Sequence, residues 1–305
     1  MERGTYFDFY EVGTGIYAAI VHDGAGALGN AGIVDLGDRT LVFDTTQSIP
    51  AAQELKNVAK KLTGQEASLV VNSHRHNDHV LGNQVFADAT IISTEVTRSV
   101  MANRLPAFLE FAKAHPEYPN QIRNRLSDAS LSDQGRWEVE RDLGDTEHLA
   151  AHLPEYVPTL PTLCFENQMH IYGSAREAQL LTYGSAHSAS DAFMYLPEDK
   201  VLFVGDLAFI GYHPSMADGN PELWVTILGR ILELEFDTVI AGHGPVGNRS
   251  HVEQTKHYVE HFIETARSNS ETVNADGIPI EYRDWRGESV YFGNLKFLNG
   301  RYGRS

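Results

Sequence analysis

The period of the hydrophobic pattern changes repeatedly along the first hundred residues of the chain. Thr40–Phe43 and Leu69–Val71 are apolar runs rich in β-branched residues, which are typical of buried strands. Between them, apolar side chains in residues 48–64 recur at helical spacing, and the segment ends in a glycine. A short helix over Val80–Phe86 and a strand over Thr90–Ser93 continue the alternation. This order of strands and helices predicts a layered α/β fold.

Residues 95–155 have a different character, because charged residues are scattered among the apolar ones. We expect two or three helices here, with Pro106, Pro116 and Pro119 separating them. The segment is predicted to be a helical insertion beside the core, of a kind that can cover a functional site. A plain surface excursion is the alternative.

Strands return after residue 160. The pattern predicts them at Leu163–Phe165, Met169–Tyr172, Ala178–Tyr183, Ala192–Leu196 and Val201–Val204. Pro221–Leu234 is amphipathic at helical spacing, Asp237–Ala241 is a further strand, and residues 250–267 form the clearest late helix. The polar and aromatic tail from Asn274 onward predicts no element.

The densest group of ligand-type side chains directly follows the Leu69–Val71 strand. It contains His74, His76, Asp78 and His79. Side chains two apart on a strand point to the same side, so His74 and His76 project together, and Asp78 and His79 can turn back toward them. Imidazole and carboxylate ligands suit zinc, iron or manganese. A metal site is predicted here, and a His-rich surface loop is the alternative.

Polar residues stand at the ends of later apolar strands as well: His187, Asp206 and His243. Strand ends in α/β sheets line one crevice, where residues distant in sequence converge. Gly205 and Gly242 directly precede two of these residues and allow the backbone to approach closely. The sequence therefore predicts one metal site assembled from several segments.

Net charge, cysteine content and the lack of a targeting pattern limit the classes of partner and the location that we expect for this protein. A net charge of −17 argues against nucleic acid or an anionic membrane as a partner, so we expect a small-molecule substrate. The single cysteine, Cys164, excludes an internal disulfide and a cysteine-based zinc cluster, and its apolar neighbours predict a buried thiol. No signal-peptide pattern or membrane-length apolar run is visible, which predicts a cytoplasmic protein. The oligomeric state is open.

The motifs His74-x-His76-x-Asp78-His79, His187, Gly205-Asp206 and Gly242-His243 resemble, in this order, those of the metallo-β-lactamase superfamily of metallohydrolases. The match runs from about Asn30 to Val246. The resemblance implies the family fold, an α/β protein built as a four-layer αβ/βα sandwich. Residues 1–305 are then expected to form a single domain, with 95–155 as its helical insertion.

The resemblance also implies a role for each ligand. The first metal would be bound by His74, His76 and His187, the second by Asp78, His79 and His243, and Asp206 would bridge them. Two divalent ions are implied, foremost zinc, with iron or manganese as alternatives. They would share a hydroxide that attacks the substrate, and Asp78 would act catalytically by orienting it or accepting its proton. Candidates for holding the ligands in place are Asp44, Ser73 and Asp191.

Asp206 stands where several true lactamases have a cysteine, and in this respect the chain looks like the hydroxyacylglutathione hydrolases, lactonases and related ester or thioester hydrolases. Ala186-His187-Ser188 departs mildly from the Gly-His-Thr or Gly-His-Ser motif of those relatives. The resemblance thus implies a binuclear hydrolase of a thioester, ester or lactone. The alternatives are a β-lactam hydrolase, a mononuclear iron sulfur dioxygenase and a non-catalytic metal-binding protein. Tyr212 and His213, shortly after Asp206, are candidates for substrate binding, with surface packing as the alternative.

Overall fold

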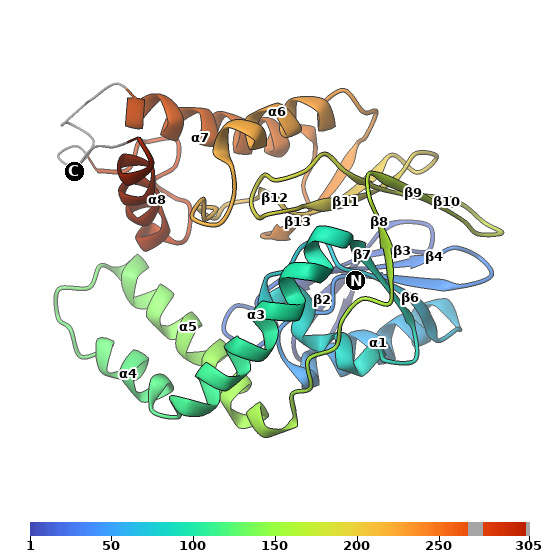
Figure 1. The fold of residues 1–305 in the computed structure, drawn as a ribbon, viewed down its shortest axis with the longest axis horizontal. Coiled ribbons are helices and arrows are strands. Elements are labelled where there is room, and N and C mark those ends of the chain that lie inside the picture. The colour runs from blue at the N-terminus through green and yellow to red at the C-terminus, as the bar shows by residue number, and fades with distance from the viewer. Residues whose placement is uncertain (268–276, 303–305) are drawn as a thin grey trace.

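Within residues 1–267 and 277–302, which the computed structural model describes, two mixed β-sheets face each other and helices cover their outer sides (Figure 1). The first sheet contains, in spatial and sequence order, β1 (Glu2–Arg3), β2 (Phe7–Gly13), β3 (Ile16–Val21), β4 (Ala31–Asp35), β5 (Thr40–Phe43), β6 (Ala67–Val71), β7 (Thr90–Thr94) and β8 (Leu163–Phe165). Neighbours from β1 to β5 are antiparallel, and those from β5 to β8 are parallel.

The second sheet has the spatial order β13-β12-β11-β10-β9. Its strands are β9 (Gln168–Tyr172), β10 (Glu177–Thr182), β11 (Ala192–Leu196), β12 (Val201–Phe209) and β13 (Thr238–His243). All neighbours are antiparallel except β12 and β13, which run parallel. Strands are therefore present wherever the period-two pattern predicted them.

Three layers of apolar side chains hold the sandwich together. Residues such as Val71 and Phe203 fill the space between the sheets, one from each sheet. On the outer side of the first sheet, α1 (Ile49–Thr63) buries Leu55 and Ala59. On the outer side of the second sheet lie α6 (Pro221–Ile231), α7 (Arg249–Arg267) and α8 (Glu288–Arg301). This helix–sheet–sheet–helix order confirms the predicted αβ/βα sandwich.

Local sequence explains where α1 begins and ends. The Ser48 side chain accepts a hydrogen bond from the Ala51 amide, which satisfies one of the free N–H groups at the helix start. Pro50 lies in the first turn, where its missing N–H costs nothing. Gly64 ends the helix with φ +75°, a left-handed conformation that favours glycine. The helix is thus set by the residues that predicted it.

The segment 95–155 is helical, as expected, but one proline lies elsewhere than predicted. It contains α3 (Glu95–Ala114), α4 (Tyr118–Arg125), α5 (Asp133–Ala151) and the 3₁₀ turn η2 (Leu153–Glu155). Pro106 was expected to separate helices, but it lies inside α3. On that helix Met101, Leu105 and Leu109 pack in one cluster with Tyr156, and this packing holds α3 together across the backbone hydrogen bond that proline removes.

Other differences concern strand ends and the tail. Asp206 was expected after its strand, but β12 continues to Phe209 through register shifts at Gly205, and His243 is the last residue of β13. Cys164 is half-buried rather than a core thiol, because it lies on β8, the last strand of its sheet. The tail, for which no element was predicted, contains α8. Among the described residues, no helix combines the length and the apolar character that a membrane span requires.

Candidate metal centre

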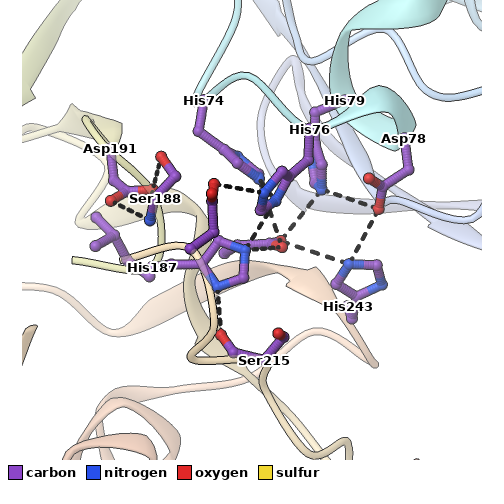
Figure 2. Close-up of polar contacts among 12 residues, drawn as sticks. His74, His76, Asp78, His79, His187, Ser188, Asp191, Ser215 and His243 are labelled. Carbon is purple, nitrogen blue, oxygen red and sulfur yellow. Dashed lines mark hydrogen bonds and ion pairs between the residues drawn. The ribbon is translucent and has the colours of Figure 1, made fainter. Parts of the chain in front are cut away.

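The predicted ligands converge at one edge of the sandwich, where strands of both sheets end (Figure 2). After β6 the chain passes through His74 and His76, and His76 is the N-cap of α2 (Asn77–Val80), which the 3₁₀ turn η1 (Leu81–Phe86) continues. Asp78 and His79 are therefore carried on the first turn of α2, which directs them back toward the strand end. The predicted helix over Val80–Phe86 is thus α2 and η1, starting three residues earlier.

The first group comprises His74, His76, His187 and one oxygen of Asp206. His76 Nδ1 lies 2.9 Å from His74 Nε2 and 3.0 Å from His187 Nε2. Asp206 Oδ2 lies 3.1 Å from His187 Nε2 and 3.6 Å from His74 Nε2. Ligand atoms about 2.1 Å from a tetrahedral ion are about 3.4 Å apart, so these spacings match those around one zinc ion.

The second group comprises Asp78, His79 and His243. Asp78 Oδ2 lies 3.3 Å from the Nε2 atoms of both histidines. The other oxygen of Asp206, Oδ1, lies 3.2 Å from His79 Nε2 and 3.5 Å from His243 Nε2. The two carboxylate oxygens of Asp206 therefore face different groups, which is the arrangement of a bridging ligand.

In four of the five histidines of the ligand set, the ring nitrogen that points away from the ligand groups contacts a hydrogen-bond acceptor of the protein; three of these are direct contacts with a carboxylate or a carbonyl. His79 Nδ1 lies 2.8 Å from Asp44 Oδ2, and His76 Nε2 lies 3.1 Å from Asp218 Oδ2. A further contact, 3.0 Å long, joins His187 Nδ1 to the carbonyl oxygen of Ser215 (Figure 2). Carboxylates and carbonyls only accept hydrogen bonds, so these ring nitrogens carry protons, and the inner nitrogens are the ones that would offer lone pairs to a metal ion after losing their own protons.

His74 is held in the same way through one intermediate hydroxyl. Ser73 Oγ donates to Asp44 Oδ2 at 2.7 Å and lies 2.9 Å from His74 Nδ1, from which it can accept. Asp44 Oδ1 also accepts from the Ser73 amide at 2.7 Å. The buried carboxylate of Asp44 thus orients one histidine of each group. Of the positions predicted to hold the ligands, Asp44 and Ser73 contact them directly.

Asp191, the third such position, contacts the loop that carries His187 and not the ring itself. Its carboxylate accepts from the amides of Ala186 and Ser188, each at 2.9 Å, and from the Ser188 hydroxyl at 2.8 Å (Figure 2). Two contacts were missed: Asp218 and Ser215 lie in a loop without a periodic pattern, where no sequence signal singles out one of many acidic residues.

The charges of the site suit divalent cations. Burial opposes the charged forms of Asp78 and Asp206, but the neighbouring histidines outweigh it and hold the pKa values of both carboxyls well below their ordinary range. Burial likewise lowers the pKa of His243, but Asp206 and Asp78 outweigh it and raise that pKa to about 9. Protons on imidazoles thus balance buried carboxylates, and metal binding would release them.

Two inner atoms test the fit to a metal directly. His79 Nε2 and Asp206 Oδ1 are buried and lie 3.2 Å apart, but neither makes a hydrogen bond of acceptable geometry within the described part of the chain. Buried polar atoms without partners are costly, and both belong to the predicted ligand set. The nitrogen and oxygen donors, their spacing and these two unpaired atoms all fit divalent ions such as zinc.

Glycines make the close packing around Asp206 possible. A Cβ atom on Gly242 would lie 1.9 Å from Asp206 Oδ1. Gly205 has φ +50°, and a Cβ atom there would lie 2.7 Å from Ser73 Oγ. Both positions confirm the expectation that glycines before the ligands allow the backbone to approach.

Tyr212 and His213 line a cavity of about 200 Å³ together with His76, His187 and Asp206. Asp23 accepts a hydrogen bond from the Tyr212 hydroxyl at 2.8 Å. His213 is only 3% exposed, its Nδ1 lies 2.9 Å from the Tyr258 hydroxyl, and burial lowers its pKa to about 4. Both residues are therefore at the site, and their role in binding substrate stays a prediction.

Comparison with known proteins agrees with this geometry. The sequence model of the metallo-beta-lactamase superfamily matches residues 25–243. A curated relative, a linear primary-alkylsulfatase from Pseudomonas sp. (strain ATCC 19151), is 21% identical over 233 residues. The alignment covers 73% of this chain and 43% of the relative, so the chain spans less than half of that protein's length.

Solved structures share the fold. A metallo-beta-lactamase from Pontibacter korlensis has a TM-score of 0.59 at 15% identity, covering 83% of this chain and 99% of its own. One from Hirschia baltica has a TM-score of 0.56 at 16% identity, covering 83% and 98%. The DIM-1 metallo-beta-lactamase has a TM-score of 0.58 at 15% identity, covering 84% and 98%. The family pattern spans most of the sequence and ends at His243, and the chain therefore belongs to the metallo-β-lactamase superfamily.

Proposed function

We propose that the protein is a two-metal hydrolase that cleaves a thioester, an ester or a lactone. The observation that supports this best is the orientation of Asp206, whose two carboxylate oxygens face the two ligand groups separately. A single-metal site would not need the second group of ligands.

In this proposal one ion is held by His74, His76 and His187. The other is held by Asp78, His79 and His243. Asp206 lies between them. Zinc is the metal proposed first, and the imidazole and carboxylate donors suit iron or manganese as well. Divalent ions at such a site supply Lewis acidity and lower the pKa of water. An aspartate in place of the cysteine of several lactamases favours the ester and thioester hydrolases among the relatives.

The residues of the chain supply positioning and a proton acceptor. Asp78 lines the cavity and its side chain is 15% exposed, so its carboxylate can reach an attacking water molecule. It can orient an attacking water molecule and accept its proton. Asp44 and Asp218 keep the imidazoles in one tautomer and one orientation, so the lone pairs stay directed inward.

A sulfate ester is the second candidate substrate. The alkylsulfatase relative favours it, and so do the guanidinium groups of Arg141 and Arg286, which line the same cavity as the ligands. Guanidinium groups bind sulfate through paired hydrogen bonds. The β-lactamases that share the fold are too distant in sequence to favour a β-lactam.

Metal analysis and an activity panel together test the proposal. Purified protein is expected to contain about two zinc ions per chain, the stoichiometry of a two-metal site, and to hydrolyse a thioester, a lactone or a sulfate ester. Asp206→Ala is expected to lose at least one ion and to lower kcat/KM by more than about 100-fold, while the exposed Asp237→Ala serves as the control. Normal metal content and activity in Asp206→Ala would refute the bridging role.

A further inference from the structure

Two chambers meet at the candidate metal centre. The metal-side chamber is the cavity of about 200 Å³ that Tyr212 and His213 line. The helix-side chamber, of about 370 Å³, lies against α3, α4 and α5. Leu28, His76 and Asp78 line both chambers, so the ligands stand at their junction. Together the chambers have the size of a small-molecule site, about 300–1,000 Å³.

The helix-side chamber offers an apolar surface. Phe108, Tyr118, Ile122 and Leu149 line it, and all four come from the helical segment between residues 95 and 155. Its polar members are partly engaged elsewhere. For example, the carboxylate of Asp145 accepts a hydrogen bond from the Gly26 amide at 2.8 Å. Gln47, Asn77, Arg125, Asp142 and Thr146 also line the chamber, so a hydrocarbon group would be transferred from water to the apolar surface that the four helical side chains form on one side of it.

The metal-side chamber contains a guanidinium group with free donors. Arg141, on α5, donates to Asp142 at 2.9 Å, but its Nε has no hydrogen-bond partner among the described residues. Its guanidinium lies over the Trp137 ring, 5.2 Å from the centroid, and Arg286 lies over the same ring at 4.6 Å. Both guanidinium groups are ion-paired, Arg286 with Asp23 and Arg141 with Asp142, but only Arg141 has a buried N–H without a partner among the described residues. Arg141 is therefore the cation best placed to bind an oxyanion.

Close backbone packing fixes the position of Arg141. A Cβ atom on Gly144, three residues later on α5, would lie 2.2 Å from the carbonyl oxygen of Gly24. The helix thus rests directly on the loop around Gly24, and the backbone at Arg141 cannot shift without separating the two segments. In a chain with a net charge of −17, Arg141 is thus a local positive charge beside the carboxylate ligands that an anionic group of a substrate could approach.

We propose that the substrate is an anionic amphiphile. Its apolar acyl or alkyl group of several carbons occupies the helix-side chamber, its scissile bond lies beside His76 and Asp78, and its oxyanion is bound by Arg141. This inference rests on the proposed hydrolase function. In the thioester case, water adds to the acyl carbon, the C–S bond breaks, and the products are a carboxylic acid and a thiol.

A matrix of thioesters tests both halves of the proposal in the zinc-loaded 305-residue chain. Acetyl, hexanoyl and octanoyl thioesters of 3-mercaptopropionate carry a carboxylate, and those of 3-mercaptopropanol are their neutral counterparts. Thiol release is followed with a disulfide reagent. We expect kcat/KM to rise up to about fourfold per methylene, the effect of burying one CH₂ group. The carboxylate series should exceed the neutral one about tenfold or more, as for a hydrogen bond to a charged group.

Two variants assign these effects to the chambers. Arg141→Ala should lower the ratio of kcat/KM for carboxylate over neutral thioesters to about one, whereas Arg136→Ala, an exposed position on the same helix, should keep the wild-type ratio. Leu149→Trp should fill the helix-side chamber and abolish the dependence on chain length while acetyl thioesters are still cleaved. Leu223→Trp, on the exposed side of α6, is the matched control.

The outcomes separate the inference from the function on which it rests. Hydrolysis of all thioesters at similar rates, with no effect of Arg141→Ala or Leu149→Trp, would overturn the amphiphile and leave the hydrolase standing. Hydrolysis of octyl sulfate that depends on both residues would support it and identify the oxyanion as the reacting group. A zinc-loaded protein that cleaves no member of either panel would overturn both.

Discussion

Replacing Asp44 with Asn would test whether the orientation of the histidines determines metal affinity. Asp44 accepts hydrogen bonds from the ring of His79 and, through Ser73, supports His74. Asn keeps the size and one carbonyl oxygen, but its amide group can only donate. The carbonyl can still accept from the Ser73 amide, and the NH₂ group then faces the Nδ1–H of His79. Two hydrogen-bond donors, the side-chain NH₂ group of the asparagine and the Nδ1–H of His79, would then face each other in a buried environment.

The size of the effect follows from the contacts that are lost. One charge-assisted hydrogen bond contributes about 1.5–3 kcal/mol, and Asp44 and His79 are both at most 1% exposed, so solvent cannot replace it. That range corresponds to about 10–150-fold in an equilibrium constant. Loss of a residue that supports a metal ligand typically costs about 10–100-fold in metal affinity, which is consistent.

Competition with a chromophoric chelator measures this affinity directly. We expect Asp44→Asn to bind zinc about 10–100-fold more weakly than the wild-type protein. Asp38→Asn, the same chemical change on an exposed loop, should bind zinc normally. The reasoning would be refuted if Asp44→Asn kept wild-type affinity while folding normally, because orientation of His79 by Asp44 would then have no energetic role.

Two further predictions concern packing and pH. Gly242→Ala places a methyl group against Asp206, so it should lower the free energy of unfolding by about 1–3 kcal/mol and weaken zinc binding. Gly229→Ala in α6 is the control and should leave zinc binding unchanged. Urea denaturation measures the free energy of unfolding, and chelator competition measures zinc binding. Burial raises the pKa of Asp145 to about 6, so the folded chain binds more protons than the unfolded chain between pH 4 and pH 6 and this residue's contribution to stability falls as pH rises. Asn does not titrate, so the free energy of unfolding of Asp145→Asn minus that of wild type should increase by about 2–3 kcal/mol from pH 4 to pH 7. Urea denaturation at both pH values measures this difference, and a difference that does not change with pH would contradict the prediction.

Much of the site could be predicted because its chemistry follows strand ends. His74 and His76 directly follow a buried apolar run, and Gly205 and Gly242 mark positions where only a bare backbone fits. These signals are local, so one sequence is enough to detect them. The layered fold followed from the change between period-two and period-3.6 patterns, which again depends on neighbouring residues.

The features that the sequence did not predict depend on contacts between segments that are far apart in the chain. Helix α8 was missed because Gly293 and Gly300 disfavour a helix, and it is stabilised by burial of Tyr291, Leu295 and Leu298 against its surroundings. The hydrogen bond from His76 to Asp218 joins residues 142 positions apart. No periodicity encodes such a pair. The substrate chambers are equally invisible, since they arise only where the helical segment meets the sheet edge.

The division of the ligands between the two sheets has a consequence for folding. The ligands that follow β6 belong to the first sheet, whereas His187, Asp206 and His243 belong to the second. Neither group of ligand atoms is complete until the sheets have docked. An ion captured at either group is then a crosslink between segments more than a hundred residues apart, and it closes a long loop that otherwise opposes folding through its entropy. Metal binding at either group would therefore stabilise the docked arrangement of the two sheets, because the two equilibria are linked.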